Sequence, residues 1–396
     1  MNSHFALVGE KLANALPLPR KRECQNAMDI FDEPPPLMEI MISSQSVGEK
    51  VNSLNTNKSP GPDSISPKLI KLAGNAIVPS LVSLYHESIN CRAVYSDWKI
   101  ARPTPIYKKD DETDWGNYRP VYLLSVPSKI MESEVNDTLV RHVFRYNNLV
   151  SNKQWAYCTG YSIELLLTDL TETWRTAVDS GKMVAVAFID FKKAFDSVSH
   201  NILEMKLNRD FGITGTLLDW LKSYLHGRQQ FTVLNGDKSE RSRVSFGIPQ
   251  GSVLGPTLFM LFTNDLLPSV SSGSLYMYTD DTTAYCIGET IDIAIAQLNK
   301  TLKEVYTWCA TNRLTPHPGK SEVMLQCSSD ISELRIRVLY EHILRIRVCQ
   351  YAHIYEYIRT HIHVYTRVYV SLLCIPISFL CKALLVKQRK HCISWE

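Results

Sequence analysis

The stretch Met277–Asp281 ends in two adjacent carboxylates between two apolar, β-branched segments, and it constrains the fold more than any other feature. Residues 275–277 before the Asp pair and 282–285 after it are typical of two short strands joined by a tight turn. Neighbouring carboxylates repel each other and resist removal from water. A divalent cation such as Mg²⁺ would compensate them, because oxygen ligands suit this ion. An ordinary Asp-rich turn is the structural alternative.

A second candidate ligand follows a strongly apolar segment. Asp190 ends the continuous apolar run of residues 183–190, whose length and flanking turns predict a buried central strand. The end of a buried strand is a common position for a ligand-bearing acid, whereas capping of the next turn is the structural alternative. One shared cation would explain both Asp190 and the hairpin acid Asp280.

The other periodic segments predict a chain of mixed helices and strands. The expected helices span residues 44–54, 67–73, 128–143, 164–180, 217–225, 257–266 and 291–312, with two more between 77 and 90 and one from about 200. The expected strands lie at residues 102–110, 117–121, 231–234, around 244 and at 323–325.

Basic residues and glycines mark two further candidate binding segments. Lys108, Lys109 and Arg119 flank the loop of a predicted hairpin. A solvated surface is the ordinary explanation for them, but they can reach a polyphosphate if the hairpin folds over a site. The loop Gly247–Pro256 contains glycines that permit close approach of its backbone to a ligand, although many such loops are plain connections.

The composition is that of a globular protein. Of the 396 residues, 45% are hydrophobic and 21% are charged, and the formal net charge of +3 makes any basic channel local rather than global. The ten cysteines form no Cys-x-x-Cys pair and no secretory signal begins the chain, so we expect reduced thiols in an intracellular protein, nuclear or cytoplasmic. Residues 368–380 are apolar but too few to span a membrane, and we expect no membrane partner.

Six motifs occur in an order that a known family shares. They are Lys58–Asp63, Asn117–Pro120, Asp190–Asp196, Gly247–Pro256, Tyr278–Asp281 and His317–Lys320. In order and spacing, from about Ser44 to Leu325, they resemble the reverse transcriptase of non-LTR retrotransposons of the jockey and CR1 type. The resemblance implies an α+β right-hand polymerase with palm and fingers, acting as an RNA-directed DNA polymerase. Its partners would be an RNA template, a DNA primer and deoxynucleoside triphosphates, and the oligomeric state stays open.

The resemblance assigns the chemistry to four residues. Asp190 and Asp280, with Asp281 as the adjacent acid, would hold two Mg²⁺ ions, with Mn²⁺ as an alternative. The reaction would be attack of a primer 3′-hydroxyl on the α-phosphate of a deoxynucleotide. Lys320 matches the lysine that protonates the leaving pyrophosphate.

The resemblance also assigns the binding of nucleotide and nucleic acid. Lys108 or Lys109, together with Arg119, would grip the triphosphate. Phe195 matches the aromatic residue that stacks under the sugar and excludes a 2′-hydroxyl. In the Gly-rich loop, residues Gln250 and Gly251 match the lining of the nucleotide and template pocket. Arg228 lies in a stretch expected to meet the template backbone.

The same resemblance divides the chain into four parts. Residues 1–50 are expected to be a linker remnant upstream of the polymerase, 51–180 the fingers and the start of the palm, and 181–326 the palm with the catalytic motifs. The remaining residues, 327–396, are expected to be an unrelated, basic, low-complexity tail, in which Leu334–Val338 recurs as Leu344–Val348. The thumb would then be truncated or absent, and the chain a truncated copy of an element.

Two places depart from the family pattern. Thr279 stands where Ala is usual, and we expect this change to be tolerated. Residues 156–158 are Ala, Tyr and Cys where the family shows Gly-Phe and an Arg. Loss of that Arg would remove a contact with the template or the nucleotide.

Two other functions are compatible with the motifs. A catalytically inactive, nucleic-acid-binding remnant of a retrotransposon would bind nucleic acid without Mg²⁺. An RNA-templated RNA polymerase could use the same palm, but Phe195 argues against it, because a bulky residue there excludes ribonucleotides in the family.

Overall fold

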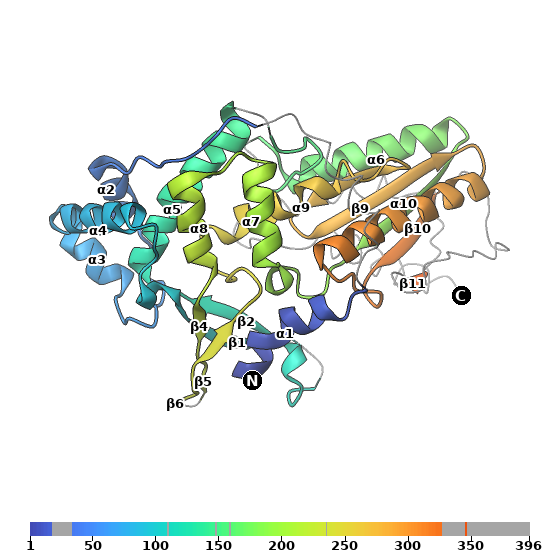
Figure 1. Cartoon of the computed structure of the whole chain (residues 1–396). Helices are drawn as coiled ribbons and strands as arrows, with labels where there is room; N and C mark the ends of the chain where they lie inside the picture. The colour runs from blue at the N-terminus through green and yellow to red at the C-terminus, as the bar shows by residue number, and fades with distance from the viewer. Residues whose placement is uncertain are drawn as a thin grey trace. The chain divides into compact units, whose positions relative to one another are not determined.

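The computed structural model describes residues 1–17, 34–108, 111–146, 149–157, 160–234, 236–326 and 345–346. These residues fall into two compact units. The first unit draws on residues 1–151, 193–264 and 310–315, and the second on residues 152–192, 265–309 and 316 onward. Both units mix helices and strands, as the sequence predicts (Figure 1).

The second unit is built on a five-stranded sheet with the strand order β11-β10-β3-β9-β8. Its strands are β3 (Met183–Ile189), β8 (Ser274–Tyr278), β9 (Asp281–Gly288), β10 (Glu322–Gln326) and β11 (Arg345–Ile346). All neighbouring strands are antiparallel except β10 and β11. The buried run of residues 183–190 therefore forms the central strand, as predicted.

Two long helices cover the two faces of this sheet (Figure 1). Helix α6 (Ile163–Asp179) packs its buried side chains, including Leu170 and Trp174, against Val186 of β3. Helix α10 (Ile291–Asn312) lies on the other face, where Thr301 Oγ1 is 3.5 Å from Cys286 Sγ of β9. Each large apolar side chain buried in this way stabilises the unit by about 1.5–3 kcal/mol.

The first unit contains a four-stranded sheet with the order β2-β1-β4-β7. Its strands are β1 (Ile100–Tyr107), β2 (Tyr118–Leu123), β4 (Arg228–Gln230) and β7 (Ser242–Val244), and β5 (Val233–Leu234) pairs separately with β6 (Asp237–Lys238). The predicted basic hairpin is confirmed, since β1 and β2 pair in antiparallel register from Arg102↔Leu123 to Tyr107↔Tyr118.

The first unit also contains a set of α-helices. They are α1 (Asn2–Asn14), α2 (Ser44–Ser53), α3 (Pro67–Ala73), α4 (Val78–Asn90), α5 (Val126–Val140), α7 (His200–Arg209), α8 (Gly215–Leu225) and α9 (Gly255–Thr263). Side chains of Ser43, Ser66 and Ser125 cap the starts of α2, α3 and α5, as serine commonly does. The prediction of two helices between residues 77 and 90 is wrong. Pro79 lies in the first turn of α4, where it starts one helix rather than separating two.

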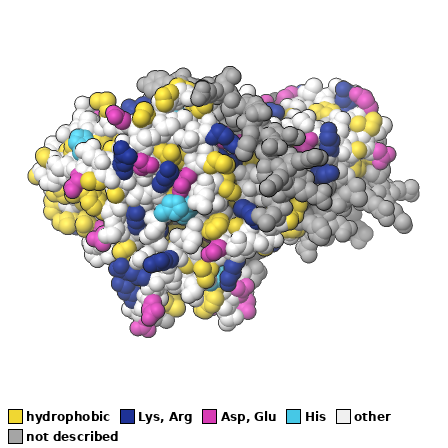
Figure 2. All heavy atoms as spheres, in the orientation of Figure 1, with side chains coloured by type: hydrophobic (Ala, Val, Ile, Leu, Met, Phe, Trp, Pro, Cys, Tyr) yellow, Lys and Arg dark blue, Asp and Glu magenta, His cyan; other side chains and the backbone are white. Residues whose placement is uncertain are grey.

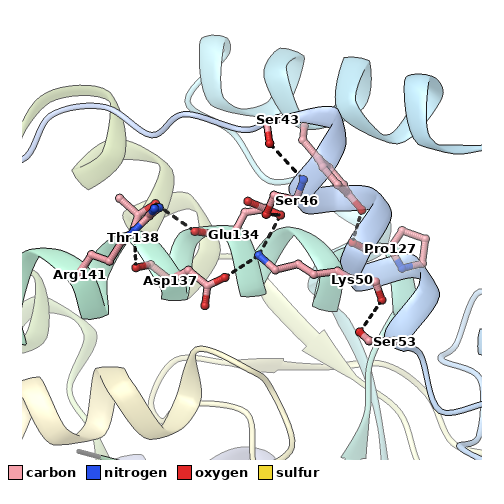
Figure 3. A network of polar contacts seen from close by, with 10 residues as sticks. Ser43, Ser46, Lys50, Ser53, Pro127, Glu134, Asp137, Thr138 and Arg141 are labelled. Atoms are coloured by element: carbon pink, nitrogen blue, oxygen red, sulfur yellow. Dashed lines mark hydrogen bonds and ion pairs between the residues drawn. The ribbon is translucent and has the colours of Figure 1, made fainter. Parts of the chain in front are cut away.

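A partly buried ion pair ties α2 to α5 (Figure 3). Lys50 Nζ lies 2.8 Å from Glu134 Oε1 and 2.8 Å from Asp137 Oδ2. The hydroxyl of Ser46 donates to the same Glu134 oxygen at 2.7 Å. Glu134 is almost fully buried, so these partners compensate a carboxylate that burial alone would destabilise.

Helix α1 departs from the linker expected at residues 1–50. The side chain of Asn2 donates to the backbone oxygens of Gln230 and Glu240. At Gly9 the helix approaches the backbone of Asp196 so closely that an added Cβ would lie 1.7 Å from its carbonyl oxygen. The sequence does not reveal this contact because the Pro-rich segment that follows dominates the composition of the stretch.

Most of the predicted tail lies outside the described residues. Residues 327–344 and 347–396 belong to this part, so the expected low-complexity tail and the loss of the thumb stay predictions. Among the helices that the structure describes, none combines the length and apolarity needed to cross a membrane. The apolar residues 368–380 also lie outside the described part of the chain.

Replacement of Gly9 tests the docking of α1. We expect Gly9→Ala to lower the free energy of unfolding by about 1–3 kcal/mol, because its methyl group would overlap the Asp196 carbonyl oxygen. Gly48→Ala in α2 is the matched control, since its Cβ would meet no atom closer than 3.9 Å and alanine favours a helix by up to about 1 kcal/mol. Urea unfolding measures both, and equal stabilities would contradict the docking.

Candidate active site

Three acids predicted as ligands meet at one end of the sheet in the second unit. The β3–β9 ladder ends with the pair Ile189↔Thr282. Asp190 is the next residue beyond β3, and Asp281 is the residue before Thr282, so the antiparallel register brings their backbones to the same end of neighbouring strands. Asp280 precedes Asp281 in the turn from β8. The sequence interpretation that one site could use all three acids thus agrees with the register.

The turn that carries Asp280 is tight and strained. Tyr278 pairs with Asp281, so only Thr279 and Asp280 connect β8 to β9. Thr279 has a φ of 61°, and a positive φ at the first turn residue alone is the type II′ pattern, which favours glycine. Such a conformation costs on the order of 1–3 kcal/mol, and a β-branched side chain rarely adopts it. The departure of Thr279 from the family pattern therefore falls on a strained position.

The segment after α10 holds Asp190 from its backbone. The amide of His317 donates to the Asp190 carbonyl oxygen at 2.7 Å, and the Asp190 amide donates to Ser321 Oγ at 3.1 Å. Lys320 Nζ then lies 3.7 Å from Asp190 Oδ2. The Lys320 side chain is 55% exposed and the Asp190 side chain 24%. The predicted catalytic lysine and the predicted metal ligand therefore lie together, and the lysine stays accessible.

The three acids suit a hard divalent cation better than a softer metal. Within the described ranges, no three His, Cys, Asp or Glu side chains lie close enough to enclose an ion by themselves. Mg²⁺ rarely needs such a cage, because it is usually held by one or two carboxylates and completes its shell with water and substrate phosphates. Asp190, Asp280 and Asp281 are all partly exposed and offer only oxygen donors, which fits this mode of binding.

The predicted nucleotide-binding residues of the first unit gather around one buried acid, Asp196. Burial raises the pKa of Asp196 to about 6, and the positive charges of Lys193, Lys108 and Arg119 oppose this rise. Lys193 is held nearby, with its Nζ donating to the Tyr118 carbonyl oxygen at 3.3 Å. Three cations from the hairpin and from the segment after β3 thus act on the same carboxyl group.

Lys109 was predicted beside Lys108 as a triphosphate ligand. It lies outside the described residues, so its role stays a prediction. Lys108 and Arg119 are both exposed at the loop end of the β1–β2 hairpin.

The aromatic residue Phe195 is fixed by stacking. Its ring lies 4.6 Å from the ring of Phe259 in α9, with an angle of 18° between the planes. Phe195 is half-buried, so part of the ring remains accessible. A ring held in this way can limit the size of a neighbouring sugar, because it cannot turn aside without losing the stack.

The Gly-rich loop is tied to both Asp196 and the hairpin. Gln250 Nε2 donates to Asp196 Oδ1 at 3.2 Å, and the Gln250 carbonyl oxygen accepts from the Tyr122 amide at 3.0 Å. Gly251 has a φ of 106°, and an added Cβ would lie 3.0 Å from the Tyr122 carbonyl oxygen. Both the conformation and the close approach require glycine here.

A buried glutamate holds the far end of the same loop. Glu132 of α5 accepts hydrogen bonds from the amides of Val253 and Leu254, at 2.8 and 3.4 Å. Burial raises the pKa of Glu132, while the positive charge of Arg228 and these two hydrogen bonds lower it.

Arg228, predicted as a template contact, is only 3% exposed. Its Nη1 donates to the Tyr224 carbonyl oxygen at 3.0 Å, and its guanidinium carbon lies 5.0 Å from the centre of the Tyr224 ring. Arg228 is therefore part of the interior of the first unit, and its role toward a template stays a prediction.

Asp196 and Glu132 were not identified as site residues from the sequence. Asp196 ends the motif that begins at Asp190, and a second acid in that motif is a usable signal. No comparable signal marks Glu132, because its burial depends on residues more than a hundred positions away.

The pKa of Asp196 gives a pH-dependent prediction. Its folded-state pKa of about 6 lies above the ordinary aspartate value of 3.8, so ionisation of this group opposes folding. Protonated Asp196 makes its full contribution to the free energy of unfolding below about pH 4, and this contribution is lost as the pH rises through about 6. We expect Asp196→Asn, which keeps the acceptor for Gln250, to raise the free energy of unfolding at pH 7.5 by up to about 3 kcal/mol.

Urea unfolding at two pH values measures this effect. At pH 5 the gain from Asp196→Asn should fall to roughly half. Asp237→Asn, which removes an exposed carboxylate of the same unit, is the control and should change stability little at either pH. A gain that does not depend on pH would contradict the raised pKa.

Comparison with known proteins shows which family the chain belongs to. Residues 106–357 match the model of the reverse transcriptase (RNA-dependent DNA polymerase) family, which is more than half of the chain. The chain belongs to the reverse transcriptase family. The matched range begins in the β1–β2 hairpin and continues past Leu325, where the resemblance seen in the sequence ends.

Several curated relatives are polymerases of insect mobile elements. The chain is 28% identical over 289 residues to the probable RNA-directed DNA polymerase from transposon BS of Drosophila melanogaster, which covers 71% of this chain and 32% of that protein. It is 27% identical over 287 residues to the RNA-directed DNA polymerase from mobile element jockey of the same organism, covering 70% and 31%. A type-1 retrotransposable element R1 Pol polyprotein of Bradysia coprophila is 28% identical over 293 residues, covering 70% and 27%. The reverse transcriptase chain thus spans about a third of the length of these relatives.

Proposed function

We propose that this chain is the polymerase part of a mobile-element reverse transcriptase. It would copy an RNA template into DNA by adding deoxynucleotides to a primer. Family membership and the relatives of this kind support the reaction class. The single observation that carries the proposal is the convergence of Asp190, Asp281 and Lys320 at the end of the β3–β9 ladder.

The proposal gives the acids the task of binding a divalent cation. Asp190 and Asp280, with Asp281 beside them, would hold Mg²⁺, or Mn²⁺ in its place. When bound, such ions neutralise charge on the phosphate oxygens of the substrate. The carboxylates themselves fix where that charge is neutralised, because the strand ends and the strained turn restrict their backbones.

Lys320 supplies the proton in this proposal. The primer 3′-oxygen forms a bond to the α-phosphorus, the bond from that phosphorus to the bridging oxygen of the β-phosphate breaks, and pyrophosphate leaves. Lys320 would donate a proton to the leaving oxygen, while the proton of the 3′-hydroxyl passes to water. Its exposure and its distance of 3.7 Å from Asp190 support this role.

Binding of the nucleotide is assigned to the cations and the Gly-rich loop of the first unit. Lys108, Arg119 and, in the undescribed part of the hairpin loop, Lys109 would bind the triphosphate. Phe195 would select a deoxyribose, and Gln250 with Gly251 would line the nucleotide and template pocket. Support comes from the shared action of Lys108 and Arg119 on Asp196, which also bonds Gln250.

Primer extension on an RNA template tests the proposal. With Mg²⁺ and deoxynucleotides, we expect the wild-type chain to extend a DNA primer. Asp280→Asn/Asp281→Asn should reduce the rate by at least about 100-fold, because the variant loses the charges that face the cation. Asp292→Asn, which removes an exposed acid of the same unit, is the matched control and should leave the rate unchanged.

The outcomes separate the proposal from its main rival. Extension by the wild type and the control, lost only in the double variant, supports a working polymerase. A folded wild-type chain that binds the primer–template without Mg²⁺ and never extends it would instead identify an inactive, nucleic-acid-binding remnant.

A further inference from the structure

A cavity of about 670 Å³ opens on the first unit, apart from the residues assigned to the nucleotide. The start of α7, the end of α8 and the strands β4 and β7 surround it. Its lining includes two arginines, Arg228 on β4 and Arg243 on β7, and two histidines, His200 and His226. The lining residues include two arginines and no carboxylate, which favours an anionic ligand.

The hydrogen-bonding capacity of Arg228 is not fully used by the fold, although its charge acts on Glu132. Its Nη1 donates to a carbonyl oxygen, whereas Nη2 is buried and has no hydrogen-bond partner among the described residues. A buried guanidinium nitrogen without a hydrogen-bond partner costs free energy, and such exceptions point to a function. Burial lowers the pKa of the nearby Lys99, and the positive charge of Arg228 lowers it further.

His200 adds a second unused polar atom. Its Nε2 is 2.8 Å from the Gly247 carbonyl oxygen, so this nitrogen carries the proton and Nδ1 is an acceptor. Burial lowers the pKa of His200 to about 4, which keeps the ring neutral. Nδ1 is buried without a partner in the described part of the chain. It can accept a hydrogen bond from a ligand hydroxyl group.

The start of α7 completes an anion site. Ser199 precedes the helix and makes no side-chain capping bond. The amides of the first turn have no partner within a helix, and the helix dipole adds positive potential there. Helix starts bind phosphate groups for this reason.

Arg243 is the accessible cation of the cavity. It is exposed on β7 and pairs in register with Gln229, the residue after Arg228. Figure 2 shows Lys and Arg side chains gathered on the face of this unit that carries α8 and β4. The exposed ring of His226 already has a partner, since Glu204 Oε1 lies 2.5 Å from its Nε2.

We propose that this cavity binds the phosphodiester backbone of a nucleic-acid strand. Arg243 and the first-turn amides of α7 would contact the phosphates, and Arg228 would contribute its charge from the wall. The choice of nucleic acid as the source of the phosphates rests on the proposed function. An RNA strand, a DNA strand and a free nucleotide share this chemistry, and separate probes distinguish them.

Binding of a labelled single-stranded oligonucleotide tests the site. The assay uses the full chain in EDTA without deoxynucleotides, so it does not depend on catalysis. We expect Arg243→Glu to weaken binding of an RNA or a DNA oligonucleotide by about tenfold and to reduce the slope of log affinity against log salt by about 0.7. Arg243→Lys should stay within about threefold of the wild type, because it keeps the charge.

Arg241→Glu is the matched control. Arg241 is exposed two residues before Arg243 and does not line the cavity. Its replacement by glutamate changes the net charge by the same amount. It should leave the salt slope unchanged. An equal loss of oligonucleotide affinity in Arg243→Glu and Arg241→Glu, or no loss in either variant, would contradict the proposed site. Displacement of the oligonucleotide by equimolar deoxynucleotide or inorganic phosphate would also overturn it, because a free nucleotide would then be the ligand.

Discussion

The antiparallel pairing of β3 with β9 determines where the acids of the second unit can act. β3 is buried on both faces, and its last pair, Ile189↔Thr282, leaves Asp190 and Asp281 at the same strand ends. A slip of one residue would turn every side chain of one strand to the opposite face and separate these acids. The cores under α6 and α10 resist such a slip, because they bury alternate residues of β3. Core packing and the position of the carboxylates therefore depend on the same register.

Buried acids organise the first unit in a comparable way. Asp196 receives the Gln250 amide and lies within the field of three cations, and Glu132 accepts the amides at the other end of the same loop. Burial of each carboxylate is costly, and hydrogen bonds and positive charges offset the cost. The two buried carboxylates therefore hold the loop that carries Gln250 at both ends, and hydrogen bonds from this loop offset the cost of burying them.

The sequence predicts the elements well where periodicity is strong, and poorly where tertiary contacts decide. The bounds of α3 and α10, the central strand and the acidic hairpin agree with the structure, since each has a clear apolar pattern and definite turn residues. Helix α1 was missed because its stability comes from contacts with distant residues such as Asp196. The motifs identified Asp190 and Lys320 together, but no pattern reveals that Arg228 is buried or that Asp196 has a raised pKa.

Iron-mediated backbone cleavage tests the central claim that strand register creates one cation site from distant acids. Fe²⁺ takes the oxygen ligands that Mg²⁺ uses, and with ascorbate and peroxide it cleaves the backbone close to where it is bound. The account predicts two cuts in the wild-type chain, near Asp190 and near Asp280–Asp281, which Mg²⁺ suppresses and which Asp190→Asn removes together. Cleavage at only one of these places, or cuts at the Asp pair that survive Asp190→Asn, would contradict a shared site.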